Sequence, residues 1–129
     1  MIIEVTPVNE CIIRLRIHYS GCLSLVPVYA PTEVSDLTMK DAFYATLESV
    51  VDQCIGRDTL LVLGNFNTST GTDRDGYETC VGPHGSGTVI QNSTKVLDFV
   101  RSHGLKVAAS WFQRPEAHCW TRYSNMVVW

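Results

Sequence analysis

Two asparagines, Asn65 and Asn67, directly follow a short apolar run at residues 59–64. A continuous apolar run of this length predicts a strand buried on both faces, and ligands of α/β proteins gather outside the carboxyl ends of such strands. Because side chains alternate along an extended chain, Asn65 and Asn67 should face one pocket while Phe66 packs beneath them. An amide forms hydrogen bonds but has no charge and no ionisable proton. These residues alone predict a ligand site or an asparagine-rich turn equally well.

Other residues capable of chemistry lack a supporting pattern. The stretch GPHGSG has no strand leading into it and no GK[ST] motif after it, which excludes the mechanics of a P-loop and predicts a flexible loop. No histidine stands at metal-ligand spacing from another histidine or a cysteine, and none lies near a recognisable nucleophile motif. We therefore expect surface or core positions for His18, His84, His103 and His118.

Residues 11–29 carry the pattern of a β-hairpin. Apolar residues alternate with two arginines at 13–17, which is the period of a half-buried strand. Ser20-Gly21 supplies a turn, and a second alternating run covers residues 23–29. Pro27 has no backbone N–H, so it predicts that the later half of this second strand is locally unpaired.

Two segments have the spacing of amphipathic helices. At residues 36–55 apolar side chains recur every three or four positions, and Ser35 or Asp36 can act as the N-cap. The same spacing recurs at residues 94–103. Each segment is followed by a glycine that predicts a left-handed stop, Gly56 and Gly104.

The remaining segments complete an α/β pattern. Residues 105–109 form another short apolar run and predict a further buried strand. Residues 66–88 are rich in Gly, Thr, Asp and Ser without a period, which predicts a long surface loop, and long loops in compact domains are often functional. Strands that alternate with helices indicate an α/β fold.

The composition is that of one globular domain. The 129 residues suffice for one hydrophobic core, and with 45% hydrophobic and 18% charged residues the chain is too apolar for disorder and too mixed for a membrane span. The net charge of −3 means that any nucleic-acid contact has to be local. Five cysteines without a CxxC pair, and a start without the features of a signal peptide, predict reduced thiols in a nuclear or cytoplasmic protein.

Five spaced motifs follow one another along nearly the whole chain. They are VYAPT around Tyr29, LLVLGNFN, GPHGSG, LDFVRSHGLKVAASWF and HCWTRYS. In this arrangement the chain resembles the endonuclease/exonuclease/phosphatase superfamily, and within it the endonuclease domains of non-LTR retrotransposons and the craniofacial development protein 2-like sequences derived from them. The resemblance implies a four-layer α/β sandwich, with two mixed sheets face to face and helices outside. It also implies Mg²⁺-dependent hydrolysis of phosphodiester bonds in DNA or RNA.

The resemblance also implies the site residues. The tyrosine of the family's YxP motif, which contacts the phosphate, falls on Tyr29. The aspartate and the asparagine of its GDFN motif fall on Asn65 and Asn67. In the family's chemistry a cation held by carboxylates neutralises the phosphate, and a His–Asp pair activates the attacking water. Asn65 replaces a carboxylate with a neutral amide, which serves neither as acid nor as base.

Further departures from the family pattern concern the metal site. An asparagine expected after GPHGSG falls on Ile90, and Arg122 stands where retrotransposon relatives have Trp. The family's metal-binding Asn and Glu before the hairpin and its terminal Asp-His pair are not found, and Glu4 and Glu10 have no supporting motif. We expect residues 1–129 to form a single domain, a partial four-layer sandwich truncated at both ends. We also expect it to have lost cleavage and not to bind Mg²⁺, and no metal ligands are assigned.

Alternative functions stay open. An active nuclease would need substitute carboxylates, for which Asp73, Asp75 and Glu78 are the candidates. A non-catalytic module would bind a protein partner, or a second copy of itself, through an exposed sheet edge or the aromatic tail at residues 120–129. A pseudogene product without a selected role is a third alternative. No membrane association is expected.

Overall fold

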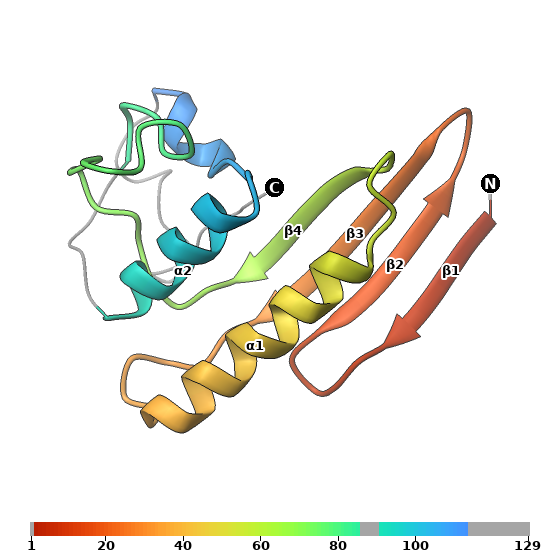
Figure 1. Cartoon of the computed structure of the whole chain (residues 1–129), viewed down its shortest axis with the longest axis horizontal. Helices are drawn as coiled ribbons and strands as arrows, with labels where there is room; N and C mark the ends of the chain where they lie inside the picture. The colour runs from red at the N-terminus through yellow and green to blue at the C-terminus, as the bar shows by residue number, and fades with distance from the viewer. Residues whose placement is uncertain (1, 86–90, 114–129) are drawn as a thin grey trace.

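The computed structural model describes residues 2–85 and 91–113, in which the chain has a mixed α/β fold with one four-stranded sheet and two α-helices (Figure 1). The predicted α/β class is confirmed. In this part of the chain no helix is long and apolar enough to cross a bilayer. The elements in chain order are β1 (Ile2–Pro7), β2 (Ile13–His18), β3 (Cys22–Tyr29), α1 (Leu37–Gln53), β4 (Thr59–Asn65), α2 (Gln91–Ser102) and the 3-10 helix η1 (Ala108–Trp111).

The sheet has the strand order β1-β2-β3-β4. β1 and β3 both pair with β2 in antiparallel fashion, and β4 pairs with β3 in parallel after the crossover through α1. The three strands predicted at residues 13–17, 23–29 and 59–64 are confirmed. β1 was not predicted, because its short alternation is weak and all six of its residues are exposed. It forms an exposed edge of the sheet, as expected.

Pro27 lies where the pairing between β2 and β3 is interrupted. Continuous pairing reaches Leu25 and resumes in a single bridge between Ile12 and Val28. On its other side Pro27 stays in register with Leu63 of β4. The predicted local unpairing is therefore confirmed on the β2 side, where the missing N–H would have been a donor.

α1 begins as predicted and packs on the sheet. Asp36 is its N-cap, and the Asp36 Oδ1 accepts a hydrogen bond from the Met39 N–H at 2.9 Å. The predicted stop at Gly56 is wrong, because the helix ends at Gln53 and Cys54 is already extended. The predicted apolar stripe is confirmed, with four buried residues and one half-buried residue, namely Phe43, Leu47, Val50, Val51 and Cys54.

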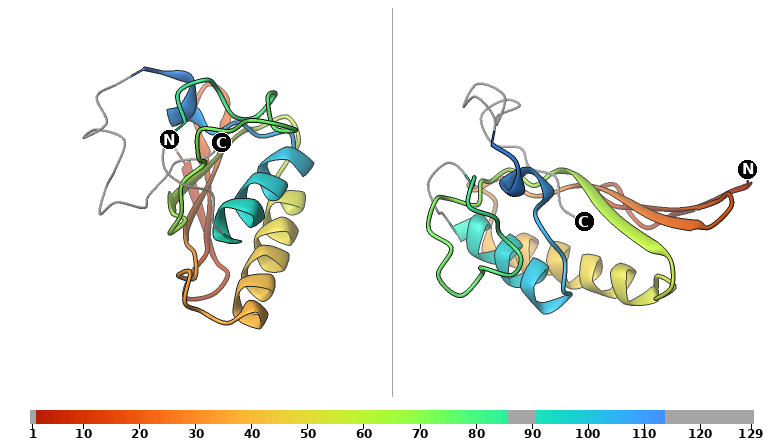
Figure 2. Two further views of the ribbon diagram at one scale, coloured as in Figure 1. Left: turned by 90° about the vertical axis from the view of Figure 1, so that its left-hand side faces the viewer. Right: turned by 90° about the horizontal axis from the view of Figure 1, so that it is seen from above.

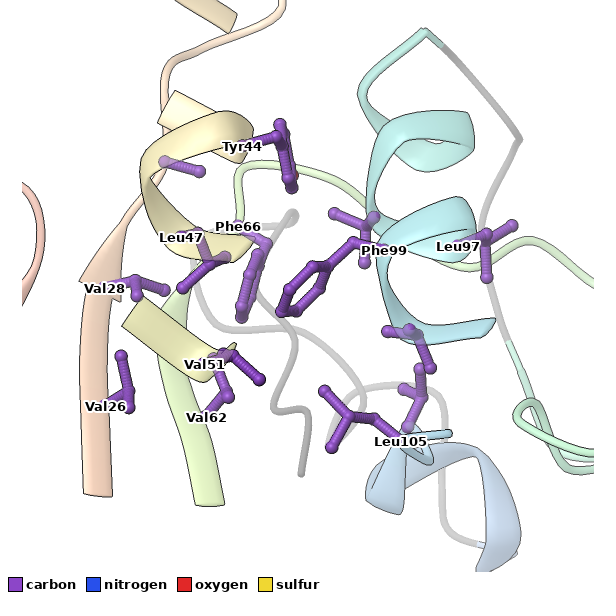
Figure 3. Close-up of a cluster of buried hydrophobic side chains, with 14 of the residues drawn as sticks. Val26, Val28, Tyr44, Leu47, Val51, Val62, Phe66, Leu97, Phe99 and Leu105 are labelled. Carbon is purple, nitrogen blue, oxygen red and sulfur yellow. The ribbon is translucent and has the colours of Figure 1, made fainter. Parts of the chain in front are cut away.

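The core continues from the sheet through α1 to α2. Phe66 is fully buried just after β4, as predicted, and lies between Leu47 of α1 and Phe99 of α2 (Figure 3). Val26 and Val62 of the two parallel strands close the same core from below the helix. Burial of one such side chain contributes about 1.5–3 kcal/mol, so this cluster is what joins the two helices to the sheet.

α2 ends as predicted and begins earlier than predicted. Gly104 has a φ of +65°, and the Leu105 N–H donates to the Val100 carbonyl oxygen at 2.9 Å, which is the bonding of a Schellman motif. The helix starts at Gln91 rather than at residue 94. Its first turn is capped from far along the chain, because the Asn92 N–H donates to the Glu33 Oε2 at 3.1 Å.

The predicted strand at residues 105–109 is wrong. Its only ladder contact among the described residues is an isolated parallel bridge between Val81 and Val107. The Ser110 N–H and the Ser110 hydroxyl both donate to the Val107 carbonyl oxygen, at 3.1 and 2.6 Å, and this turns the chain into η1. An apolar run is therefore buried here without a neighbouring strand long enough to pair with it.

The segment at residues 66–88 is only partly the surface loop that its composition predicts. Thr68, Thr70, Cys80 and Val81 are buried. The part before residue 86 is tied to the end of the described chain, because the Gly82 N–H donates to the Ser110 hydroxyl at 2.8 Å and the His84 N–H to the Ser110 carbonyl oxygen at 2.8 Å. Short polar side chains thus allow the loop to pack rather than to extend into solvent.

Both helices lie on one side of the sheet (Figure 2). The other side, here called the open face, is apolar: the register sets Val5, Leu15, Leu25 and Leu61 side by side across all four strands. Val5 is 59% exposed, and none of the open-face residues is fully buried. The set comprises Ile3, Val5, Leu15, Ile17, Leu23, Leu25, Leu61 and Leu63.

Candidate functional site

The carboxyl ends of β3 and β4 bring together the residues singled out from the sequence. Tyr29, the last residue of β3, is in register with Asn65, the last residue of β4. The pairing continues one residue further, since the Ala30 N–H donates to the Asn65 carbonyl oxygen at 2.7 Å. Tyr29 is 56% exposed, so a ligand at this edge of the sheet can reach it.

Asn65 and Asn67 form a closed turn. The Asn65 Oδ1 accepts a hydrogen bond from the Asn67 N–H at 2.8 Å, which is an Asx turn. Asn67 has a φ of +51° and its Nδ2 donates to the Ala30 carbonyl oxygen at 2.6 Å. The chain thus leaves the extended conformation after Phe66, so alternation cannot be used to place Asn67 on the side of Asn65. What the structure shows is a turn that fastens the end of β4 to the end of β3.

A third asparagine, Asn92 in the first turn of α2, lies at the same place and was missed in the sequence. It is only 2% exposed, and its Nδ2 donates to the carbonyl oxygens of Pro31 at 3.1 Å and Asn67 at 3.5 Å. Its Oδ1 is buried without a hydrogen-bond partner. The only sequence signal is a polar residue where a helix begins. We call Tyr29, Asn65, Asn67 and Asn92 the carboxyl-edge cluster.

A buried lysine holds the surroundings of the cluster in place. Lys40 of α1 is 1% exposed, and its Nζ donates to the Glu33 carbonyl oxygen and to the Gln91 Oε1, both at 2.8 Å. The Glu33 carboxylate lies 3.8 Å from the same Nζ and accepts the Asn92 N–H. The positive charge of Lys40 is therefore used inside the fold and is not offered to a ligand.

The oxygen donors at the carboxyl-edge cluster do not fit a magnesium site. Mg²⁺ is usually bound through one or two carboxylates, whereas this cluster offers amides and a phenol. The Asn65 oxygen already closes its turn, and the nearby Glu33 carboxylate is engaged with Asn92 and Lys40. Across residues 2–85 and 91–113, no group of three His, Cys, Asp or Glu side chains could hold a metal ion.

The three loop carboxylates considered as substitutes lie toward the other end of α2. The turn that carries them is fixed there by the Tyr77 hydroxyl, which donates to the Asp98 Oδ1 at 2.7 Å. Asp98 is nearly two helical turns, about 9 Å, from Asn92. The Glu78 carboxylate accepts backbone N–H groups of its own turn, and these lower its pKa. Asp73 is used in the same way, accepting the Asp75 N–H at 3.0 Å.

Several positions named from the sequence lie outside the described residues. These are Ile90, Arg122, the HCWTRYS motif and the aromatic tail at residues 120–129. The carboxyl-edge cluster itself lies within the described residues, between Tyr29 and Asn92.

Comparison with known proteins gives one distant similarity. The chain is 25% identical over 114 aligned residues to Craniofacial development protein 2 from Tragulus javanicus. The aligned residues make up 88% of this chain and 20% of that protein. The chain thus spans about a fifth of the length of this relative. No protein-family model matches.

Proposed function

We propose that this chain is an endonuclease/exonuclease/phosphatase-type domain of non-LTR retrotransposon origin in which phosphodiester cleavage has been lost. The motif order between residues 15 and 124 and the similarity to Craniofacial development protein 2 support the origin. Under this proposal the ancestral substrate is DNA or RNA, the ancestral cofactor is Mg²⁺, and the protein works in the nucleus or the cytoplasm.

The main observation in support of lost cleavage is the uncharged side chain of Asn65 and the hydrogen bond that it makes. At the position of the family's aspartate it has an uncharged side chain whose oxygen closes the turn to Asn67. The side-chain amide of Asn67 donates a hydrogen bond to the Ala30 carbonyl oxygen. The residues of the motif thus hold the ends of β3 and β4 together. Among the described residues of this edge, the carboxyl-edge cluster has no carboxylate of its own, and the Glu33 carboxylate nearby is already engaged by Asn92 and Lys40. An amide neither binds a cation as a carboxylate does nor transfers a proton.

A plasmid-nicking assay tests this proposal. Supercoiled plasmid is incubated with the purified chain, with Asn65→Asp and with Asn9→Asp, each in Mg²⁺ and in Mg²⁺ with excess chelator. Asn9 is the matched control, because its Oδ1 also closes a turn, accepting the N–H groups of Cys11 and Ile12, but that turn joins β1 to β2 and does not carry the family's motif. We expect no chelator-sensitive nicking by any of the three proteins, since one added carboxylate does not complete a metal site and a base.

Two outcomes of the assay would overturn the proposal or correct it. Chelator-sensitive nicking by the unmodified chain would mean that cleavage is intact. Nicking by Asn65→Asp but not by Asn9→Asp would mean that the rest of the catalytic site is present and that Asn65 alone silences it.

A second function, a non-catalytic interaction module, is favoured by the open face. Its apolar residues run across all four strands, and β1 adds an exposed edge whose backbone groups can pair with another strand. This function is compatible with lost cleavage. Light scattering of the unmodified chain and of the open-face variant Val5→Lys tests whether this face mediates association.

A further inference from the structure

Cys22 and His18 face each other across the turn between β2 and β3. They are the last in-register pair of this hairpin, and the Cys22 Sγ lies 3.5 Å from the His18 Nδ1. The turn is closed by the Tyr19 N–H, which donates to the Gly21 carbonyl oxygen at 2.9 Å. No sequence motif marks His18 as the partner of a nucleophile, yet the structure places a cysteine thiol beside its imidazole. The predicted turn at Ser20-Gly21 was the signal that could have paired these two residues.

The other nitrogen of the same imidazole is held by a carboxylate. The His18 Nε2 lies 2.8 Å from the Glu4 Oε2 of β1. A carboxylate at Nε2 favours the tautomer with its proton on Nε2, which leaves a lone pair on Nδ1 facing the thiol. The hydrogen bond to His18 lowers the pKa of Glu4, so the carboxylate stays ionised. A nucleophile, a base and a group that orients the base thus stand in line on three adjacent strands.

A small polar pocket adjoins this line of residues. It has a volume of about 140 Å³ and is lined by Glu4, Thr6, Arg14 and Arg16. Arg16 is engaged by the Asp58 carboxylate at 2.7 Å. Arg14 makes no hydrogen bond or ion pair with another residue in the described part of the chain, so its guanidinium is free to bind an anionic group.

The site is open to solvent. The hairpin that carries Cys22 extends past the C-terminal end of α1 (Figures 1 and 2), and Cys22 is half-buried rather than enclosed. Two other cysteines differ from it: Cys54 and Cys80 donate to backbone carbonyl oxygens, and burial raises the pKa of both thiols. Cys11, also half-buried, is free and has no histidine partner among the described residues.

We propose that Cys22 is a nucleophilic thiol, with His18 as its base and Glu4 as the orienting carboxylate, that exchanges with disulfides bearing a carboxylate. The thiol proton passes to the His18 Nδ1, and the thiolate attacks one sulfur of the disulfide. The original S–S bond breaks as a mixed disulfide with Cys22 forms. The departing thiolate takes the proton back from the imidazolium and leaves as a thiol. Arg14 pairs with the carboxylate and selects the disulfide by charge.

The test compares two disulfides of opposite charge on the reduced full chain at neutral pH. Glutathione disulfide carries carboxylates and cystamine carries amines; modification of each cysteine is followed by peptide mass mapping. We expect glutathione disulfide to modify Cys22 at least about tenfold faster than Cys11, because a placed base typically contributes this much or more. His18→Gln should bring the rate at Cys22 down to that at Cys11. Arg14→Gln should slow only the reaction with glutathione disulfide, whereas the exposed Arg57→Gln, with the same change in charge, should not.

A second, uncharged probe tests the reactivity of the Cys22 thiol without any contribution from charge recognition in the pocket. Iodoacetamide is uncharged, so its rate at Cys22 should fall in His18→Gln and stay unchanged in Arg14→Gln, provided that circular dichroism shows folded variants. Equal rates at Cys22 and Cys11, or a His18→Gln variant that reacts like the unmodified chain, would overturn the proposal. An equal slowing by Arg14→Gln and Arg57→Gln would show that the overall charge and not the pocket selects the disulfide.

Discussion

At the residue scale, the placement of Asn65 depends on the glycine before it. A Cβ at Gly64 would lie 2.0 Å from the Val28 carbonyl oxygen of the neighbouring strand. The φ of Gly64 is +132°, a backbone conformation that is strained for any residue with a side chain. We expect Gly64→Ala to lower the free energy of unfolding by about 3 kcal/mol, because β3 and β4 have to separate to make room. Urea denaturation measures this change.

Gly56→Ala is the matched control for this prediction. A Cβ at Gly56 meets nothing within 4 Å, so the substitution should change the free energy of unfolding by less than about 0.5 kcal/mol. Equal effects of the two alanines would contradict the close approach of the strands at Gly64.

Asp58 makes a pH-dependent contribution to stability. Its side chain has no exposed area and accepts hydrogen bonds from Arg16 at 2.7 Å and Ser24 at 2.9 Å. The bond from Arg16, followed by that from Ser24, lowers the pKa of Asp58. A lowered pKa in the folded state means that the stabilisation is complete above the ordinary aspartate pKa of about 3.9 and is lost as pH falls through the lowered value.

We therefore expect Asp58→Asn to destabilise the chain at pH 7 and to differ less from the unmodified chain near pH 2. Denaturation at both pH values measures the difference, with the exposed Asp75→Asn as control. A gap between Asp58→Asn and the unmodified chain that stays constant down to pH 2 would rule out the ion pair as its source.

The candidate site shows which residues a sequence can place and which it cannot. Asn65 could be assigned to the end of a strand, and Phe66 to the core, because a buried strand dictates both positions from local pattern. Asn67 could not be placed, because its turn depends on an Asn65 side chain folding back on the chain. Asn92 could not be found because it meets Pro31 and Asn67, contacts that only the packing of α2 creates.

At the element scale, Lys40 of α1 joins the segment that follows β3 to the start of α2, which is distant in sequence. Its Nζ holds the Glu33 carbonyl oxygen after β3 and the Gln91 side chain at the start of α2. We expect Lys40→Ala to lower the free energy of unfolding by about 2–4 kcal/mol, because it leaves buried acceptors and the Glu33 carboxylate without their partner. The measurement is again urea denaturation.

Lys95→Ala provides the comparison. Lys95 also pairs with an acid across the two helices, but its partner Asp41 is exposed, and such pairs contribute about 0–1 kcal/mol. A loss of stability in Lys40→Ala no larger than in Lys95→Ala would mean that Lys40 does not fasten α2 to α1.

Elements with a clear period were predictable, and those stabilised by distant contacts were not. α1 carries its own N-cap and apolar stripe, so its sequence was sufficient to predict its start and its buried face, although not its end. α2 takes its first capping acceptor from Glu33, and its start was therefore misplaced. The apolar run around Val107 has the composition of a strand but meets only a one-residue bridge to Val81, so a strand was wrongly assigned.

At the scale of the whole molecule, the two faces of the sheet differ in their covering. The side with Val26 and Val62 is closed by α1, whereas the open face presents a row from Val5 to Leu61 with no fully buried member. A contiguous apolar surface of this kind is typical of an interface. Face-to-face packing of two such sheets, about 10 Å apart, would bury both open faces in a twofold dimer without disturbing either helix layer.

Substitutions on the edge strand β1 test whether the chain associates through the open face or through another part of its surface. Val5 and Thr6 are neighbours on β1 with side chains on opposite faces, and both are exposed. We expect light scattering to show that the unmodified chain associates as its concentration rises. Val5→Lys should weaken this association about tenfold, because it would bury a charge in the contact, whereas Thr6→Lys should leave it unchanged. Equal weakening by both lysines would point to pairing at the β1 edge, because a new charge on either face of an edge strand opposes that contact. A chain that stays monomeric at millimolar concentration would remove self-association through the open face from the functions considered.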